Sequence, residues 1–266
     1  MKPGAHWWLL TRQQLRGRVR SIVIWGVALG ALGALYVALF PSMSELLRQY
    51  LEQASEQMRQ FMGQVEDSMT IEGWMEMEFI ASIIPIALPF MAIPIGARAI
   101  SGSEERKTLD LLLSNPLARR HVVISAIGTM AGALACVLAI TWVLTYIAVP
   151  IAGVDLGPGR LAAALVVLWV FCLLFGALAL LVSTWVRRSF LAIVIPAVIL
   201  VAMYVIANLA QVSKSAEPIR VFSLFYHLGH PLRGDFPWTA VLLMLAAICL
   251  IGGAAIAAFD RRDIYT

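Results

Sequence analysis

The chain is organised around residues 98–125, RAISGSEERKTLDLLLSNPLARRHVVIS, a charged segment between two long apolar runs. Ser101 followed three residues later by Glu104 has the form of a capping box, which predicts the start of a helix. Glu104 and Glu105 would then place negative charge in the first turn, where the helix dipole favours it. A separate short helix is therefore predicted to begin here, outside the membrane.

An apolar ridge runs along this predicted helix, because Leu109, Leu112 and Leu113 recur at helical spacing. Pro116 disfavours helical geometry at the residue before it, so the helix is predicted to stop there. The product is a short amphipathic helix with charged flanks. Physical reasoning alone leaves two roles open, a surface helix against lipid headgroups and a helix gripped by a soluble partner.

Residues 104–120, EERKTLDLLLSNPLARR, resemble the segment after the second span of ABC-2-type transporter permeases, E-x-x-x-G-T-L-E-L-L-L-x-x-P-x-x-R. The sequence follows that pattern from Thr108 to Arg119, with Asp110 where glutamate is usual, and it has Lys107 where glycine is common; in this register the first glutamate of the pattern falls on Ser103. In that family the segment is the coupling helix, which docks into a cleft of the ATP-hydrolysing subunit. The resemblance implies a coupling role for eight residues: Glu104, Glu105, Thr108, Leu109, Leu112, Leu113, Pro116 and Arg119.

Composition places the whole chain in a membrane. Of its 266 residues 61% are hydrophobic and only 14% are charged, and the mean hydropathy is +0.84. Several runs approach or exceed the roughly 20 apolar residues that cross a bilayer as a helix. The predicted fold is an all-α polytopic membrane protein with six transmembrane helices, an N-terminal interfacial helix and a cytoplasmic coupling helix.

The chain divides into segments of a single transmembrane domain, residues 1–266. The basic, tryptophan-bearing start, residues 1–20, is predicted to lie in the membrane interface. The coupling helix is expected at 102–115. The predicted spans are 22–40, ended by Pro41, then 79–100, 122–149, ended by Pro150, 161–186, 190–211 and 238–259. Residues 42–78 are acidic and are interpreted as helical extensions or an outer amphipathic helix, with a solvated acidic face.

Small residues and prolines mark where spans pack or bend. Gly26–Gly30 and Gly128–Gly132 are small-xxx-small pairs, which allow close helix contact within one subunit or at a dimer seam. Three prolines within ten residues of the second span must kink or loosen it. A translocation pathway is hypothesised along this span and the fifth, with these residues: Pro85, Pro89, Phe90, Tyr204 and Asn208.

The distribution of basic residues predicts the orientation. Fourteen of the 20 Lys and Arg residues fall on the side that carries both termini and residues 98–120. The positive-inside rule therefore places both termini and the coupling helix in the cytoplasm. The expected location is the plasma (inner) membrane of a prokaryote.

Catalytic chemistry is not expected from this chain. A P-loop needs glycine immediately before its Lys-Thr and again five residues earlier, whereas Lys107-Thr108 has Arg106 and Ser101 at those positions. No aspartate, glutamate or histidine falls in the middle of a predicted span, which argues against intramembrane proteolysis and against an ion-coupled carrier. His227 and His230 have no obvious third metal ligand. No catalytic residue, metal site or nucleic-acid partner is predicted.

The resemblance and the topology together predict the permease subunit of an ATP-driven exporter, with an apolar or amphiphilic substrate. Its expected partners are an ABC ATPase in two copies, a second permease subunit in a homo- or heterodimer, and membrane lipid. ATP and Mg²⁺ would be held by the ATPase, and no cofactor by this chain. A membrane scaffold that recruits a cytoplasmic partner and a secondary carrier are the alternatives.

Overall fold

A computed structural model describes residues 6–53, 70–105, 119–186, 188–212 and 214–261. These residues are almost entirely helical and include no strand, which confirms the predicted all-α fold. The elements in order are α1 (His6–Gly17), α2 (Val19–Gln53), α4 (Ile71–Met75), the π-helix η2 (Glu76–Ile83), α5 (Ile84–Ala87), α6 (Pro89–Glu105), α8 (Arg119–Ala152), α9 (Pro158–Trp185), α10 (Ser189–Val212), the 3₁₀ helices η3 (Lys214–Phe222), η4 (Leu224–Leu228) and η5 (Pro231–Arg233), and α11 (Trp238–Asp260).

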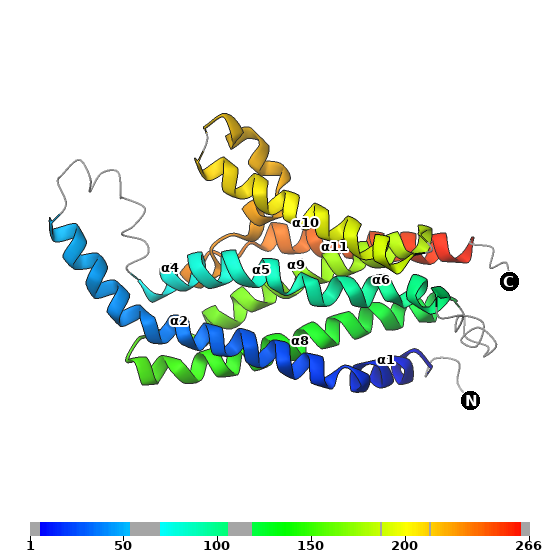
Figure 1. Cartoon of the computed structure of the whole chain (residues 1–266), viewed down its shortest axis with the longest axis horizontal. Helices are drawn as coiled ribbons and strands as arrows, with labels where there is room; N and C mark the ends of the chain where they lie inside the picture. The colour runs from blue at the N-terminus through cyan, green and yellow to red at the C-terminus, as the bar shows by residue number, and fades with distance from the viewer. Residues whose placement is uncertain (1–5, 54–69, 106–118, 187, 213, 262–266) are drawn as a thin grey trace.

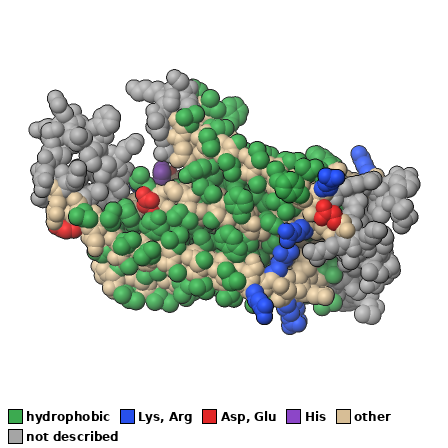
Figure 2. Space-filling view, in the orientation of Figure 1, with side chains coloured by type: hydrophobic (Ala, Val, Ile, Leu, Met, Phe, Trp, Pro, Cys, Tyr) green, Lys and Arg blue, Asp and Glu red, His purple; other side chains and the backbone are tan. Residues whose placement is uncertain are grey.

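Six helical segments of the described chain are long and apolar enough to cross a membrane. They lie side by side along the long axis of the molecule (Figure 1). Hydrophobic side chains cover most of the face drawn in Figure 2, as expected of a surface in contact with lipid. The six segments are Val19–Leu46, Ile71–Gly102, Arg120–Ala152, Pro158–Trp185, Ser189–Ala210 and Trp238–Asp260.

Helix α9 is the centre of the bundle. It packs against α6, α8, α10 and α11, and it is the most buried of the six spans. Its sequence is apolar on every face, which is the pattern of a helix surrounded by protein. Phe171 and Phe175 are fully buried on it, with ring centroids 5.1 Å apart.

Glycines set the closest helix contacts. Helix α2 crosses α8 where a Cβ on Gly26 would lie 2.8 Å from Ile140 Cβ, and one on Gly30 would lie 2.7 Å from Leu144 Cβ. The first small-residue pair therefore packs within the subunit, the first of the two uses predicted for it. Helix α1 lies on α8 over the second pair, with Leu15 against Gly132.

Helices α6 and α9 approach each other most closely at Gly96 and Gly176. A Cβ on Gly96 would lie 2.2 Å from the carbonyl oxygen of Gly176 and 3.0 Å from the backbone nitrogen of Leu180. Because these neighbours are backbone atoms, they cannot move aside as a side chain could. Glycine at this position is therefore what lets α6 lie directly against the central helix.

The second span is broken, as its three prolines predict. It consists of α4, η2, α5 and α6 in succession. Pro85 lies in the first turn of α5, and Pro89 begins α6 after a turn at Leu88. Proline lacks the N–H of a regular helix, and the wider π-helical turns of η2 end just before Pro85. Pro94 lies inside α6 without ending it.

Two other prolines do not act as the sequence predicted. Helix α2 continues through Pro41 to Gln53, and α8 continues through Pro150 to Ala152, so the expectation that these prolines end their helices was wrong. A proline removes one backbone hydrogen bond and can kink a helix, but at these two positions the helix continues on both sides. The Ser44 hydroxyl donates to the Pro41 carbonyl oxygen at 2.9 Å, so this carbonyl has an additional partner.

We predict that Gly96→Ala destabilises the folded protein. The added methyl group must displace backbone of α9, and overpacking of this kind costs about 1–3 kcal/mol. Because the obstructing atoms are backbone, we expect a cost in the upper part of this range, above the roughly 1 kcal/mol that alanine gains over glycine within a helix. The thermal unfolding midpoint of the purified protein in detergent measures the effect.

Gly253→Ala is the matched control, because a Cβ on Gly253 in α11 would meet no heavy atom within 4 Å. Its midpoint should equal or exceed that of the wild type. A Gly96→Ala protein as stable as Gly253→Ala would contradict the close contact between α6 and α9.

Candidate functional site

One end of the bundle gathers arginines from several elements, and we call it the arginine end. Among its described members are Arg18 between α1 and α2, Arg98 on α6, Arg120 on α8, Arg188 before α10 and Arg261 after α11. In Figure 1 α6 ends and α8 and α10 begin at this end of the molecule. The segment that the sequence singles out connects α6 to α8, so it starts and finishes at the arginine end.

The structure describes the borders of that segment. Thr108, Leu109, Leu112, Leu113 and Pro116 lie outside the described residues, so their coupling role stays a prediction. Two further candidates lie at its borders, Glu104 in the last turn of α6 and Arg119 at the first residue of α8.

The helix of the second span does not stop where the capping box predicted a new start. Helix α6 runs without a break from Pro89 to Glu105, and Ser101 is buried inside it. The Ser101 hydroxyl donates to the carbonyl oxygen of Ala97 at 2.6 Å, one turn earlier. The predicted start at Ser101 was therefore wrong, because a serine within a continuing helix bonds back to its own backbone. Residues 102–105 belong to the end of span two.

Glu105 caps the first turn of α10. Its carboxylate accepts hydrogen bonds from the backbone N–H of Ser189 at 2.8 Å and from the Ser189 hydroxyl at 2.5 Å. The carbonyl of Arg188 accepts from Leu191 N at 3.1 Å, so Arg188 holds the N-cap position. An arginine side chain has no acceptor for the free N–H groups of a helix start. The Glu105 carboxylate, supplied by α6, is the acceptor instead. It also places negative charge at the positive end of the α10 dipole.

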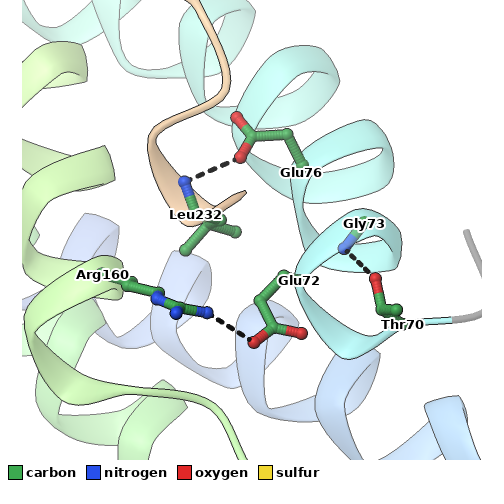
Figure 3. A network of polar contacts seen from close by, with 6 residues as sticks. All are labelled: Thr70, Glu72, Gly73, Glu76, Arg160 and Leu232. Atoms are coloured by element: carbon green, nitrogen blue, oxygen red, sulfur yellow. Dashed lines mark hydrogen bonds and ion pairs between the residues drawn. The ribbon is translucent and has the colours of Figure 1, made fainter. Parts of the chain in front are cut away.

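A second polar network lies at the opposite end of the bundle (Figure 3). Glu72 pairs with Arg160 at 3.1 Å, which joins α4 to the first turn of α9. The Glu76 carboxylate accepts from the backbone N–H of Leu232 at 2.9 Å, which joins η2 to η5. The Thr70 side chain accepts from Gly73 N at 3.1 Å and caps α4.

Glu76 is the deepest part of this network. It is only 2% exposed, and it begins the π-helix. Short π-helical stretches occur frequently at functional sites. The contact makes the broken second span and the segment before α11 depend on each other at this end.

The hypothesised pathway residues lie in different surroundings. Pro85 and Pro89 are buried, whereas Phe90 is 42% exposed. The exposed Asn208 side chain donates to the Tyr204 carbonyl oxygen of its own helix at 2.9 Å. The Tyr204 ring packs edge-on against Phe225, 5.5 Å between centroids. Contacts between α10 and both α5 and α6 bring the two spans together, and the pathway itself stays a hypothesis.

A family model for the ABC-2 family transporter protein matches residues 8–264, almost the entire chain. The chain belongs to this family. No curated protein matches it. The protein is therefore an ABC transporter permease, the membrane subunit of a transporter, and its six apolar spans agree with that assignment.

Two positions of this permease were not singled out from the sequence. Ser189 follows two arginines that were interpreted only as the end of span four, and its partner Glu105 lies 84 residues earlier. Glu76 was grouped with a solvated acidic face, but it is buried. The burial of Glu76 could have been predicted from its neighbours. It lies directly after Met75 and three residues before Phe79, and both of these apolar residues belong to the core.

The described residues contain no group of three His, Cys, Asp or Glu that could hold a metal ion. The Nε2 atom of His227 lies 2.9 Å from the carbonyl oxygen of Val221, so this histidine contacts its own segment of the permease.

We predict that Glu105→Ala loosens the start of α10. Loss of a capping acceptor costs about 1 kcal/mol, and loss of its charge at the helix dipole adds several tenths. The backbone amides of residues 189–191 should therefore exchange with solvent about fivefold faster or more. Hydrogen–deuterium exchange with mass spectrometry measures this directly.

Glu78→Ala is the control, because Glu78 is an exposed carboxylate of η2 and lies at the other end of the second span. Exchange in the first turn of α10 should not change in that variant. Glu105→Gln, which keeps an acceptor and loses the charge, should fall between the two. Wild-type exchange rates in Glu105→Ala would contradict the capping role.

Proposed function

We propose that this permease couples ATP hydrolysis by a separate ABC ATPase to export of an apolar or amphiphilic substrate. The observation that supports coupling most directly is the capping of α10 by Glu105. The chain leaves α6 at this residue to enter the segment that resembles a coupling helix. A force applied to that segment therefore reaches the start of α10 through two hydrogen bonds, as well as α6 through the backbone.

The arginine end would face the cytoplasm, where the ATPase is found. The positive-inside rule favours that orientation, because the described ends of α1 and α11 and the borders of the coupling segment all carry arginines there. Both termini would then be cytoplasmic, in the plasma membrane of a prokaryote. ATP and Mg²⁺ would be bound by the ATPase, since the Lys107-Thr108 pair lacks the glycines of a P-loop.

The proposed substrate class rests on the lack of charged side chains in the second span. From Phe79 to Ala97 the second span contains no ionisable side chain, although it is the span most disrupted by prolines. A pathway along it and α10 would offer aromatic and hydroxyl groups and no fixed charge. Such a surface suits an apolar or amphiphilic molecule. Two permease subunits and two ATPase subunits would form the working transporter.

Within the coupling segment, Leu109, Leu112 and Leu113 would form the apolar contact with the ATPase. Glu104, Thr108, Pro116 and Arg119 would set the limits and polar edges of the docking surface. Because Glu105 binds Ser189 within the subunit, its role would be to transmit the movement.

We predict that Leu112→Arg prevents assembly with the ATPase while leaving the permease in the membrane. A charged side chain at the centre of an apolar interface leaves an uncompensated buried charge, which costs several kcal/mol. The measurement is quantitative mass spectrometry of the complex purified from native membranes, together with its ATP hydrolysis. The expected result is loss of both the P-loop ATPase and its activity.

Ser114→Arg is the matched control, because it adds the same charge away from the leucine ridge. That variant should retain the ATPase at the wild-type ratio. Retention of an active ATPase by Leu112→Arg would show that the ridge is not the coupling surface. A wild-type permease that purifies without any P-loop ATPase would favour a scaffold or a secondary carrier.

A further inference from the structure

A groove with a volume of about 310 Å³ lies between α8 and α9. Three of its lining residues are alanines, Ala135 and Ala139 from α8 and Ala162 from α9, and their small side chains leave the space open. The other lining residues are aliphatic or are tryptophans, so the lining is apolar throughout. Ala135, Ala139 and Val166 are exposed, so the groove opens on the outer surface of the bundle.

Two tryptophans of the lining tie α8 to α9 and fix the shape of the groove. The indole N–H of Trp142 on α8 donates to the Pro158 carbonyl oxygen at 3.1 Å, and that of Trp169 on α9 donates to the Ala131 carbonyl oxygen at 2.9 Å. Each helix thus gives one indole to the backbone of the other. The Tyr146 ring stacks on Trp142, with 5.5 Å between the ring centroids and 6° between the planes. The groove is therefore preformed, and both indole donors already have partners.

These two ties give the groove a length and a depth in the membrane. On each helix the two tied residues are eleven positions apart, so at 1.5 Å per residue the ties are separated by about 16 Å. One leaflet of a bilayer contributes about 15 Å to the hydrocarbon core. Pro158 is the first residue of the fourth span, at the end of the bundle opposite the arginine end. The groove therefore extends from one edge of the membrane to about its middle, which is the depth of a single leaflet.

We propose that this groove binds one acyl chain of a membrane phospholipid, from the leaflet opposite the arginine end. Its lining offers many weak dispersion contacts and no free indole donor, which suits a hydrocarbon chain. Its volume lies at the low end of the range for small-molecule pockets, about 300–1,000 Å³. A transmembrane helix of a second subunit, about 10–12 Å across with its side chains, is too thick to enter it.

The site is separate from the hypothesised pathway, which follows the second and fifth spans. A bound chain would cover the three alanines and contact α8 and the central helix α9 at the same time. The lining carries no charge, and the nearby Arg160 already pairs with Glu72 at 3.1 Å. Binding should therefore depend on the acyl chain and not on the headgroup.

The test uses the full-length permease in phosphatidylcholine vesicles that contain a small, variable fraction of a photoreactive phosphatidylcholine. This probe carries a diazirine in the middle of one acyl chain, and mass spectrometry maps the residues that it labels on illumination. The variant Ala139→Phe fills the groove with a ring. The matched control is Val143→Phe, which adds the same ring one turn further along α8, at a position that is 46% exposed and does not line the groove.

In the wild type the probe should label residues 135–142 and 162–169, and this labelling should saturate as the probe fraction rises. Labelling of the exposed Leu250 on α11, which contacts ordinary bilayer lipid, should instead rise in proportion to the probe. Ala139→Phe should reduce the labelling of the groove about tenfold, the effect of a loss of roughly 1.4 kcal/mol in binding. Val143→Phe should leave it unchanged. A phosphatidylglycerol probe with the same chain should label the groove equally well.

Three results would overturn the proposal. One is groove labelling that rises in proportion to the probe, as on α11, which would indicate ordinary lipid contact. Another is an equal reduction by Val143→Phe, which would place the bound chain outside the groove. The third is a wild-type groove that the probe does not label, which would indicate that a second subunit or another apolar molecule covers it. The saturation measurement uses the wild type alone, so it decides the question even if Ala139→Phe fails to fold.

Discussion

The carboxylate of Glu105 holds the last turn of one span against the first turn of another. Helix α10 starts after Arg187 and Arg188, whose side chains donate hydrogen bonds and cannot accept them, so its free N–H groups need an acceptor from elsewhere. Glu105 supplies it from the end of α6, through contacts of 2.8 and 2.5 Å to Ser189. This is also the point at which the chain enters the segment that resembles a coupling helix. Under the proposed coupling, a displacement of that segment would act on α6 through the backbone and on α10 through these two hydrogen bonds.

The rest of the bundle determines where such a displacement can go. Helix α6 lies directly on the central helix α9 through Gly96 and Gly176, and a contact between backbones leaves little room for sliding. Before Pro89 the second span is divided into the short helical pieces α4, η2 and α5, and prolines and π-helical turns are the usual places at which a helix bends. At the far end Glu76 ties those pieces to Leu232. The second span thus has one continuous helix next to the arginine end and a series of short helical pieces that Glu76 fastens at the far end.

Much of this fold could be predicted from the sequence, because apolar runs, small-residue pairs and clustered prolines act locally. The composition predicted the helical membrane fold. The Gly26–Gly30 pair predicted a close helix contact, and the structure identifies α8 as its partner. The residues taken as signals of helix ends and starts were less reliable. Pro41, Pro150 and the Ser101 capping box were interpreted as helix limits, but helices continue through all three, since packing along a span outweighs one unfavourable residue. The contacts of Glu105 and Glu76 join residues 84 and 156 positions apart, and no local pattern contains that information.

The proposed coupling requires that α6 and α10 move as one unit during the ATP cycle. It is tested most directly by joining them covalently. Glu105→Cys and Ser189→Cys, in a permease whose three native cysteines are replaced, would be bridged by a short bifunctional thiol reagent within the assembled complex. If the two helices move together, the bridged complex hydrolyses ATP at the rate of the unbridged double variant. Loss of hydrolysis on bridging, restored when a reducible bridge is cleaved, would show that the helices must separate and would contradict the claim.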